Sequence, residues 1–312
     1  MSQARVKELA IIGAGIAGVS AAIYAKRSGL EFDIFESKAL GGQLLLMENI
    51  DNYAGIPAGT KGFELSEALS RNLSGLDIEP INQEILSIKI DKDLIWLKSQ
   101  ENNYTYKTLI IATGATFRRL DVPGESQLTG KGVSYCAVCD GFFFKGKTVA
   151  VIGGGNTAAE EALYLSDVAE KVFLVHRRDQ LRALGYLQKE IFAKKNIEII
   201  FGHVVEKVNG TTKVDSLILS NIKNGEKKPL SLQGVFIAIG ITPATSLFSG
   251  LLDLDDSGFI LTDEFLQTSS PLIWACGDCR KRPLKQLITA ASEGAIASLS
   301  VYKHLRGHYI SA

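Results

Sequence analysis

The sequence lacks most of the features that mark secreted scaffolds, membrane proteins and disordered chains. Its 312 residues include only four cysteines and seven prolines, and no apolar run approaches the roughly 20 residues that a helix needs to cross a bilayer. Lys and Arg together number 34, as do Asp and Glu, so no excess charge is available to attract nucleic acid or anionic lipid. With 46% hydrophobic and 22% charged residues, the composition predicts a globular protein of roughly two domains.

The N-terminus has two interpretations. Arg5 and Lys7 precede an apolar stretch, as in a secretory signal peptide. The same stretch contains Gly13, Gly15 and Gly18, and this spacing favours a nucleotide-binding turn instead. We therefore expect a soluble, cytoplasmic protein with no membrane partner.

The four cysteines form two C-x-x-C pairs, Cys136 with Cys139 and Cys276 with Cys279. A disulfide scaffold of this size would normally carry more cysteines at wider spacings. Zinc is an alternative, but the pairs lie about 140 residues apart and no histidine is close to either pair in the sequence. The pattern therefore predicts no metal site.

The chain repeats one segment at an offset of 140 positions, so that Gly13 matches Gly153. Residues 9–36 and 149–176 each contain a short apolar strand, a glycine-rich turn, a helix and a second strand. This order predicts a βαβ unit with a G-x-G-x-x-G/A turn, in which backbone and helix N–H groups bind a pyrophosphate. One such motif is weak evidence, but two at a constant offset are strong evidence for two dinucleotide sites.

The two repeats differ at the end of their second strand. Glu36 stands where a carboxylate would hydrogen-bond an adenosine ribose. The second repeat has His176 at the matching position, and three arginines follow it, Arg177, Arg178 and Arg182. Guanidinium groups in place of the carboxylate favour a ribose 2′-phosphate, and therefore NADP over NAD. The alternative is a solvated basic strand end.

Two further apolar strands that run into glycine, residues 108–115 and 234–242, complete the two halves. After Pro243 the chain contains no third βαβ unit, so it must return to the first domain. We expect an α/β protein with two Rossmann-like, three-layer dinucleotide-binding domains, the second inserted in the first. The first domain would comprise residues 1–115 and 244–312, and the second residues 116–243.

A set of motifs carries a resemblance to a known family: GAGIAG (13–18), GGQL (41–44), ATGA (112–115), CAVCDG (136–141), GGGNTA (153–158), HRRDQLRA (176–183) and ACGDC (275–279). In this order and spacing the chain resembles low-molecular-weight thioredoxin reductases over essentially its whole length. The most specific element is C-x-x-C-D-G just before the second glycine motif. Other flavoproteins with two dinucleotide domains usually carry their cysteine pair in the first domain or lack one.

The resemblance implies that Cys136 and Cys139 form a redox-active disulfide. A C-x-x-C pair at a turn or helix start can close a disulfide, and in its reduced form the pKa of one thiol can be lowered, which disulfide exchange requires. In the family the second cysteine, here Cys139, takes electrons from the flavin, and the first, here Cys136, attacks the thioredoxin disulfide. Asp140 matches the family's acid/base. The alternative is a pair of buried structural cysteines.

The resemblance also implies FAD in the first domain and NADPH in the second. The residues expected to bind FAD are Gly13, Gly15, Ile16, Ala17, Gly18, Glu36, Gly41, Gly42, Gln43, Asn52, Thr113, Gly114, Asp278, Lys285, Gln286 and Leu287. Those expected to bind NADPH are Gly153, Gly155, Asn156, Thr157, His176, Arg177, Arg178 and Arg182.

The chain departs from the family's pattern near its C-terminus. Residues 284–287 read Leu-Lys-Gln-Leu where relatives often have Tyr-Arg-Gln-Ala, and a tail with His308 and Tyr309 follows the final helix. Tyr309 would either stack on the flavin or be a loosely packed terminal residue. Cys276 and Cys279 are either apolar fillers beside Asp278, which we favour, or a second dithiol.

We therefore expect a FAD- and NADPH-dependent thioredoxin-disulfide reductase, with thioredoxin or a thioredoxin-like protein as partner, and a homodimer. Domain rotation about the connections near 115–118 and 242–245 would let the disulfide meet both flavin and partner. Three alternatives remain: a scaffold that takes electrons from ferredoxin, a dithiol oxidase that uses oxygen, and a flavin-binding redox sensor without turnover. The HRRDQLRA segment argues against the first two. The balanced charge argues against nucleic-acid binding.

Overall fold

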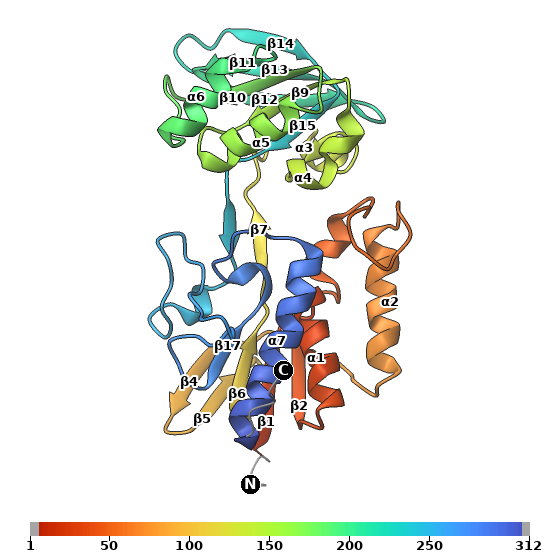
Figure 1. The fold of residues 1–312 in the computed structure, drawn as a ribbon, viewed down its shortest axis with the longest axis vertical. Helices are drawn as coiled ribbons and strands as arrows, with labels where there is room; N and C mark the ends of the chain where they lie inside the picture. The colour runs from red at the N-terminus through yellow and green to blue at the C-terminus, as the bar shows by residue number, and fades with distance from the viewer. Residues whose placement is uncertain (1–5, 308–312) are drawn as a thin grey trace. The chain divides into compact units, whose positions relative to one another are not determined.

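In the computed structural model, which describes residues 6–307, the chain forms two compact units (Figure 1). The first unit comprises Met1–Thr116 and Thr242–Ala312, and the second Phe117–Ile241, so the second unit is inserted in the first. These bounds differ by one or two residues from those expected from the sequence. His308 and Tyr309, the tail considered as a cover for the flavin, lie outside the described residues.

The first unit has three layers because its central strands bury both faces. The parallel strands lie in the order β3-β2-β1-β6, and β17 also pairs with β6 in parallel. Leu9 and Ile11 of β1 pack against helices α1, α2 and α7, whereas Ala10 and Ile12 face the opposite core, which includes residues of β5. Since successive side chains of a strand point to opposite faces, a continuous apolar strand fills both cores.

The elements of the first unit are, in chain order, β1 (Lys7–Ile12), α1 (Ile16–Arg27), β2 (Phe32–Glu36), η1 (Gly42–Leu46), α2 (Gly62–Ser74), β3 (Ile81–Asn82), β4 (Ser87–Asp91), β5 (Leu94–Lys98), β6 (Asn103–Ile111), η3 (Ser246–Phe248), β17 (Ile273–Ala275), η4 (Gly277–Cys279) and α7 (Leu287–Arg306). Strands β4, β5 and β6 form an antiparallel meander.

The second unit repeats this plan. Its parallel sheet has the order β11-β10-β9-β15-β8, helices α5 and α6 pack on one face, and the antiparallel strands β12, β13 and β14 pack on the other. The expected fold class, α/β with two Rossmann-like three-layer domains, is confirmed. The elements are α3 (Glu125–Leu128), β8 (Val133–Ser134), α4 (Ala137–Asp140), η2 (Gly141–Phe144), β9 (Thr148–Ile152), α5 (Asn156–Ser166), β10 (Lys171–His176), α6 (Gly185–Ala193), β11 (Ile197–Phe201), β12 (His203–Gly210), β13 (Val214–Asn221), β14 (Lys227–Ser231) and β15 (Gly234–Ile237).

Strands β6 and β15 end earlier than the sequence suggested. The strand expected over 108–115 ends at Ile111, and the one expected over 234–242 ends at Ile237. Gly114 has a φ of +70° and Gly240 a φ of +114°, conformations that turn the chain away from the sheet. The apolar residues before each glycine therefore do not all belong to the strand.

The two connections between the units pair with each other. Strands β7 (Ala115–Phe117) and β16 (Ile241–Pro243) form a separate two-stranded sheet, and the Arg118 N–H donates to the Gly240 carbonyl (3.0 Å). The two ends of the second unit are therefore neighbours.

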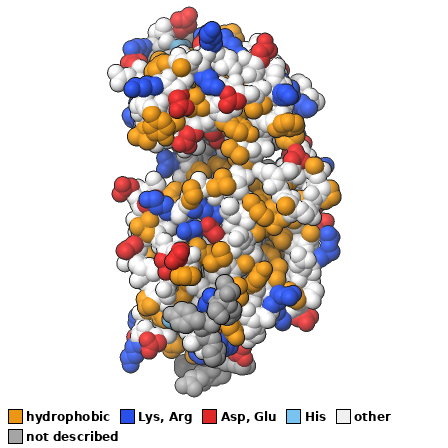
Figure 2. Space-filling view, viewed as in Figure 1, with side chains coloured by type: hydrophobic (Ala, Val, Ile, Leu, Met, Phe, Trp, Pro, Cys, Tyr) orange, Lys and Arg blue, Asp and Glu red, His pale blue; other side chains and the backbone are white. Residues whose placement is uncertain are grey.

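Charged side chains of both signs are scattered over the face shown in Figure 2, with no large patch of one sign. This matches the equal numbers of acidic and basic residues in the sequence. Among residues 6–307, no helix combines the length and the hydropathy needed to span a bilayer.

Candidate active site

The first glycine turn joins β1 to α1 and leaves room for a phosphate. A Cβ at Gly13, whose φ is +105°, would lie 2.4 Å from the Ala112 carbonyl oxygen, and a Cβ at Gly18 would lie 1.8 Å from the Gly13 oxygen. At Gly15 a Cβ would meet nothing within 4 Å, and no side chain caps the first N–H groups of α1. Open space beside uncapped helix N–H groups is what a pyrophosphate needs, so the turn fits a dinucleotide.

Glu36 stands at the end of β2, directly beside this turn. Its Oε2 accepts a hydrogen bond from the Ala14 N–H (2.7 Å), and its Oε1 accepts one from the Lys38 N–H (2.9 Å). These bonds fix the carboxylate, and its oxygens keep further lone pairs with which to accept from ribose hydroxyls. The position predicted for Glu36 from its spacing is therefore suited to the predicted role.

Several loop residues predicted to bind FAD come together within the first unit. The Gln43 amide donates to the Ala115 carbonyl, and the Asn52 amide donates to the Gln286 side-chain oxygen (3.1 Å). The Thr113 hydroxyl donates to a carbonyl of the returning segment (2.7 Å). Segments far apart in the sequence are thus joined around the carboxyl ends of the parallel strands, where open α/β sheets bind ligands.

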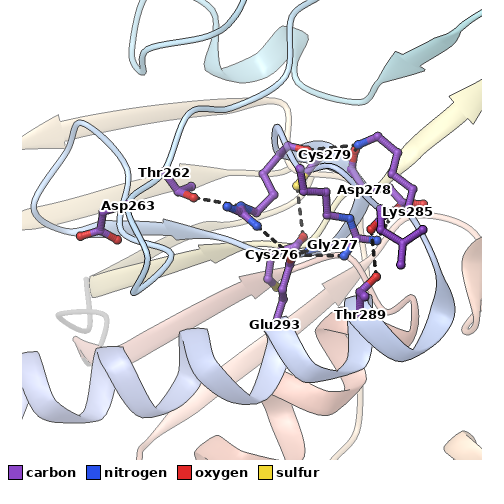
Figure 3. A network of polar contacts seen from close by, with 12 residues as sticks. Thr262, Asp263, Cys276, Gly277, Asp278, Cys279, Lys285, Thr289 and Glu293 are labelled. Atoms are coloured by element: carbon purple, nitrogen blue, oxygen red, sulfur yellow. Dashed lines mark hydrogen bonds and ion pairs between the residues drawn. The ribbon is translucent and has the colours of Figure 1, made fainter. Parts of the chain in front are cut away.

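Lys285, another residue predicted to bind FAD, is tied to the loop that carries Asp278 (Figure 3). Its Nζ donates to the carbonyl oxygens of Asp278 (3.0 Å) and Arg280 (3.1 Å), and it lies 4.0 Å from the centre of the Phe259 ring. Burial lowers the pKa of Lys285, against the opposing effect of the Asp278 charge. In this structure the ammonium group fixes the shape of the loop.

In the second unit, Cys136 and Cys139 form the disulfide, with their Cα atoms 5.3 Å apart. Cys136 is the N-cap of the short helix α4, and its sulfur accepts a hydrogen bond from the Cys139 N–H (3.2 Å). The exposed side chain of Val138 lies between the two cysteines in sequence. The pair is therefore held on a tight helical turn, a geometry suited to opening and closing a disulfide.

Asp140, the predicted acid/base, is held by a serine that sequence reasoning missed. The Ser134 hydroxyl donates to Asp140 Oδ2 (2.5 Å), and the Ser134 hydroxyl oxygen accepts from the Cys136 N–H (3.1 Å). Ser134 is buried at the end of β8 and therefore links the backbone of the redox pair to the Asp140 carboxylate.

Glu161 of α5 is a second carboxyl group at this turn that the sequence did not reveal. Its Oε1 accepts from the Ala137 N–H (3.4 Å), and its Oε2 is buried without a hydrogen-bond partner in the described part of the chain. Burial, and less strongly the charges of Asp140 and Glu160, raise the pKa of Glu161 to about 7, against the opposing effect of the hydrogen bond from Ala137. The turn thus contains a carboxyl group that exchanges protons near neutral pH.

The second glycine turn, between β9 and α5, is hydrogen-bonded to the arginine-rich loop that follows β10. A Cβ at Gly153 would lie 2.3 Å from the Ala238 oxygen, while one at Gly155, the N-cap of α5, would meet nothing within 4 Å. The Arg182 N–H donates to the carbonyl oxygen of residue 154 (2.7 Å), and the Asn156 side-chain oxygen accepts from a backbone N–H at residue 184 (2.9 Å). The basic loop is therefore anchored on the turn.

The four basic residues predicted to bind a 2′-phosphate divide into two groups. Arg177, Arg178 and Arg182 are exposed, and none has a carboxylate partner within residues 6–307. His176 is buried, and a Cβ at Gly154 would lie 2.3 Å from its ring. Burial, and then the nearby arginines, lower the pKa of His176, so the imidazole is neutral and packs under the turn. The positive charge of this loop therefore comes from the three exposed guanidinium groups and not from His176.

Cys276 and Cys279 are free thiols with no exposed surface. Burial raises the pKa of Cys279 to about 11 and that of Cys276 well above its ordinary value. Buried thiols that stay protonated are poor nucleophiles, which favours the apolar-filler interpretation over a second dithiol. Across residues 6–307, no group of three or more His, Cys, Asp or Glu side chains is placed to hold a metal ion.

Comparisons with known proteins agree with this geometry. The family model described as pyridine nucleotide-disulphide oxidoreductase matches residues 7–294. A thioredoxin reductase of Treponema pallidum is 40% identical over 93% of this chain and 94% of its own. The crystal structure of thioredoxin reductase from Streptococcus pyogenes covers 98% of this chain and 100% of its own, with 41% identity and a TM-score of 0.94. A ferredoxin-flavin thioredoxin reductase from Clostridium acetobutylicum is 32% identical, covers 97% of this chain and 98% of its own, and has a TM-score of 0.54.

Proposed function

Because the chain belongs to the pyridine nucleotide-disulphide oxidoreductase family, we propose that it is a thioredoxin-disulfide reductase that takes electrons from NADPH through FAD. The observation that carries this proposal is the Cys136–Cys139 disulfide in the unit that also holds the second dinucleotide turn. Relatives named thioredoxin reductase match the chain over nearly its whole length, which supports the choice of partner.

The two cysteines perform the exchange with the partner protein. In the reduced enzyme, the Cys136 thiolate attacks one sulfur of the thioredoxin disulfide, forming a mixed disulfide and releasing a thiolate on the partner. The Cys139 thiolate then attacks Cys136, which re-forms the Cys136–Cys139 disulfide and releases the second partner sulfur. Asp140, held by Ser134, takes a proton from the attacking Cys139 thiol and gives a proton to a departing partner thiolate, so the two partner thiols carry away the two protons of the reduced pair.

The first unit would hold FAD, which when bound supplies two-electron chemistry between the nicotinamide and the disulfide. The first glycine turn would bind the pyrophosphate and Glu36 the adenosine ribose. The loops that carry Gln43, Asn52 and Asp278 would surround the rest of the cofactor.

The second unit would bind NADPH through its own glycine turn and the three exposed arginines that follow β10. Arginine presents a planar set of donors that matches a phosphate, which NADH lacks at its ribose. Preference for NADPH over NADH therefore depends on Arg177, Arg178 and Arg182.

An anaerobic titration of the purified protein with NADPH tests the proposal. We expect stoichiometric loss of the oxidised-flavin absorbance, a much weaker response to NADH, and catalytic reduction of thioredoxin. Cys139→Ser should keep FAD bound and reducible by NADPH but lose thioredoxin reduction. The control is Cys276→Ala, which removes a buried free thiol of the first unit and should keep turnover. Thioredoxin reduction by Cys139→Ser would contradict the mechanism.

The same titration separates the alternative electron donors. A flavin that ignores NADPH but is reduced by ferredoxin would assign the chain to the ferredoxin-dependent type, to which one of its structural relatives belongs by name. A protein that oxidises no NADPH catalytically with any disulfide would be a sensor. We also propose that the enzyme acts in the cytoplasm and that it is a homodimer. Gel filtration with light scattering tests the oligomeric state.

A further inference from the structure

The first unit contains a network of charged side chains behind Asp278, drawn in Figure 3. We call it the Asp278 network, and its members are Asp278, Arg280, Arg282, Lys285 and Glu293. Asp278 is its most exposed carboxylate, with 30% of its side chain accessible, whereas only 2% of the Arg282 side chain and 13% of the Glu293 side chain are accessible. The network therefore lies mostly inside the protein and presents one carboxylate at its outer edge.

Arg282 connects the two carboxylates. Its Nη2 donates to Asp278 Oδ1 and, at 3.4 Å, to the Gln286 carbonyl oxygen. Its Nη1 forms an ion pair with Glu293 Oε2 at 3.2 Å, and both Nη1 and Nε are buried without a hydrogen-bond acceptor among residues 6–307. One guanidinium group thus separates two negative charges and joins the Asp278 turn to the start of α7.

Glu293 fixes the same turn from the other side. Its Oε2 accepts from the Gly277 N–H (2.8 Å), and its Oε1 pairs with Arg280 Nη1 (2.6 Å). Arg280 in turn donates from Nε to the Thr262 hydroxyl (2.9 Å). Arg280 and Arg282 therefore share Glu293, but only Arg282 reaches the Asp278 side chain.

Burying a guanidinium group to this degree costs several kcal/mol unless its pairing compensates the lost hydration. The two arginines and Lys285 also exceed the two carboxylates by one positive charge, although a neutral network would be less costly to bury. A structural role alone would be met by Arg280 with Glu293. The additional cation, Arg282, directs its Nη2 to Asp278, the side chain of the network that we propose to contact FAD.

We propose that Arg282 is a positioning residue for the flavin: it holds the Asp278 carboxylate in one rotamer, and acts on FAD through Asp278. This inference rests on FAD being the cofactor, as proposed above. Arg282 is too buried to offer a surface to the cofactor itself, so its effect passes through the carboxylate. Without Arg282, Asp278 would lose the donor that fixes it and would need reordering each time FAD binds.

Titration of the FAD-free protein with FAD, followed by quenching of flavin fluorescence, tests this directly. We expect Arg282→Gln to raise the FAD dissociation constant about tenfold or more, since one charge-assisted hydrogen bond to a carboxylate is worth roughly 1.5–3 kcal/mol. Arg282→Lys, which keeps the charge, should recover part of the affinity. Arg280→Gln is the matched control, because it removes the other guanidinium group from Glu293 without touching the Asp278 side chain, and its dissociation constant should stay near that of the unaltered protein.

A second comparison separates positioning from folding. In an Asp278→Asn background, Arg282→Gln should add little further loss, because both changes act on the same contact. Equal effects of Arg282→Gln and Arg280→Gln, or fully additive effects with Asp278→Asn, would overturn the proposal and make the network purely structural. If the unaltered FAD-free protein itself fails to bind FAD, the proposed function fails instead.

Discussion

Glu161 is the residue whose protonation we expect to change the stability of the second unit most. Its pKa of about 7 in the folded protein lies above the ordinary value of 4.5, so the folded state binds this proton more tightly than the unfolded chain does. The resulting stabilisation is complete below pH about 4.5 and is lost as the pH rises through about 7. A shift of this size corresponds to at most about 3 kcal/mol.

Replacing Glu161 with Gln should therefore flatten the pH dependence. Calorimetric melting from pH 5 to 8 should show a falling midpoint for the second unit of the unaltered protein and a nearly constant one for Glu161→Gln. Glu190→Gln is the control, because Glu190 is an exposed residue of α6 in the same unit that does not act on the pKa of Glu161, and it should leave the fall in place. A parallel fall in Glu161→Gln would assign the pH dependence to another group.

At the scale of residues, the sequence was informative where the signal was local. The glycines at 13 and 153 and the Cys136–Cys139 pair are recognisable because a turn and a three-residue spacing are themselves the feature. Glu161 and Arg282 could not be found in that way. The bond from Ala137 to Glu161 joins residues 24 positions apart, and only the fold shows that Arg282 is buried between two carboxylates.

At the scale of elements, the close packing of α1 on α7 depends on one glycine. A Cβ at Gly294 of α7 would lie 2.1 Å from the Ala17 carbonyl oxygen and 2.9 Å from the Ala21 nitrogen, both on α1. The Ser20 hydroxyl of α1 also donates to the Ala291 carbonyl of α7 (2.7 Å), so the two backbones are held together at this level. An added methyl group would force the helices apart.

Gly294→Ala should accordingly destabilise the first unit by about 1–3 kcal/mol, although alanine is the better helix former by about 1 kcal/mol. The tryptophans at positions 96 and 274 both lie in the first unit, so their fluorescence during urea unfolding reports on it. Ser292→Ala, at an exposed position of the same helix, should be close to neutral in the same measurement. Stabilisation by Gly294→Ala would show that the helices can separate freely.

The type of each main element could be read from the sequence, but not where it ends. The run before Gly114 is apolar up to Ala112, yet β6 ends at Ile111 because the backbone turns away from the sheet. The meander of β4 and β5 was not anticipated, since its strands show short alternating patterns without a distinctive turn motif. Patterns therefore predict the presence of elements, and backbone geometry decides their ends.

For the whole molecule, the lack of a third βαβ unit after Pro243 predicted an insertion, and the structure shows how the chain achieves it. The second unit has its own two cores, on the two faces of its own sheet. Its ends, Phe117 and Ile241, lie on the paired strands β7 and β16. A segment with a separate core and adjacent ends meets the usual conditions for independent folding.

We therefore expect a fragment spanning residues 115–243 to fold without the rest of the chain, since the contacts of both its cores stay within it. It should show cooperative unfolding, close the Cys136–Cys139 disulfide under oxidising conditions, and bind NADP⁺ but not FAD, because the first glycine turn is missing. Nucleotide binding by the fragment can be measured by calorimetry with and without NADP⁺. Bound NADP⁺ should raise the melting midpoint of the fragment, and it should also raise the midpoint at which the second unit melts in the full chain. A fragment carrying Arg177→Gln, Arg178→Gln and Arg182→Gln should fold equally well and show no such rise. An unfolded fragment would mean that the second unit depends on the first for its stability.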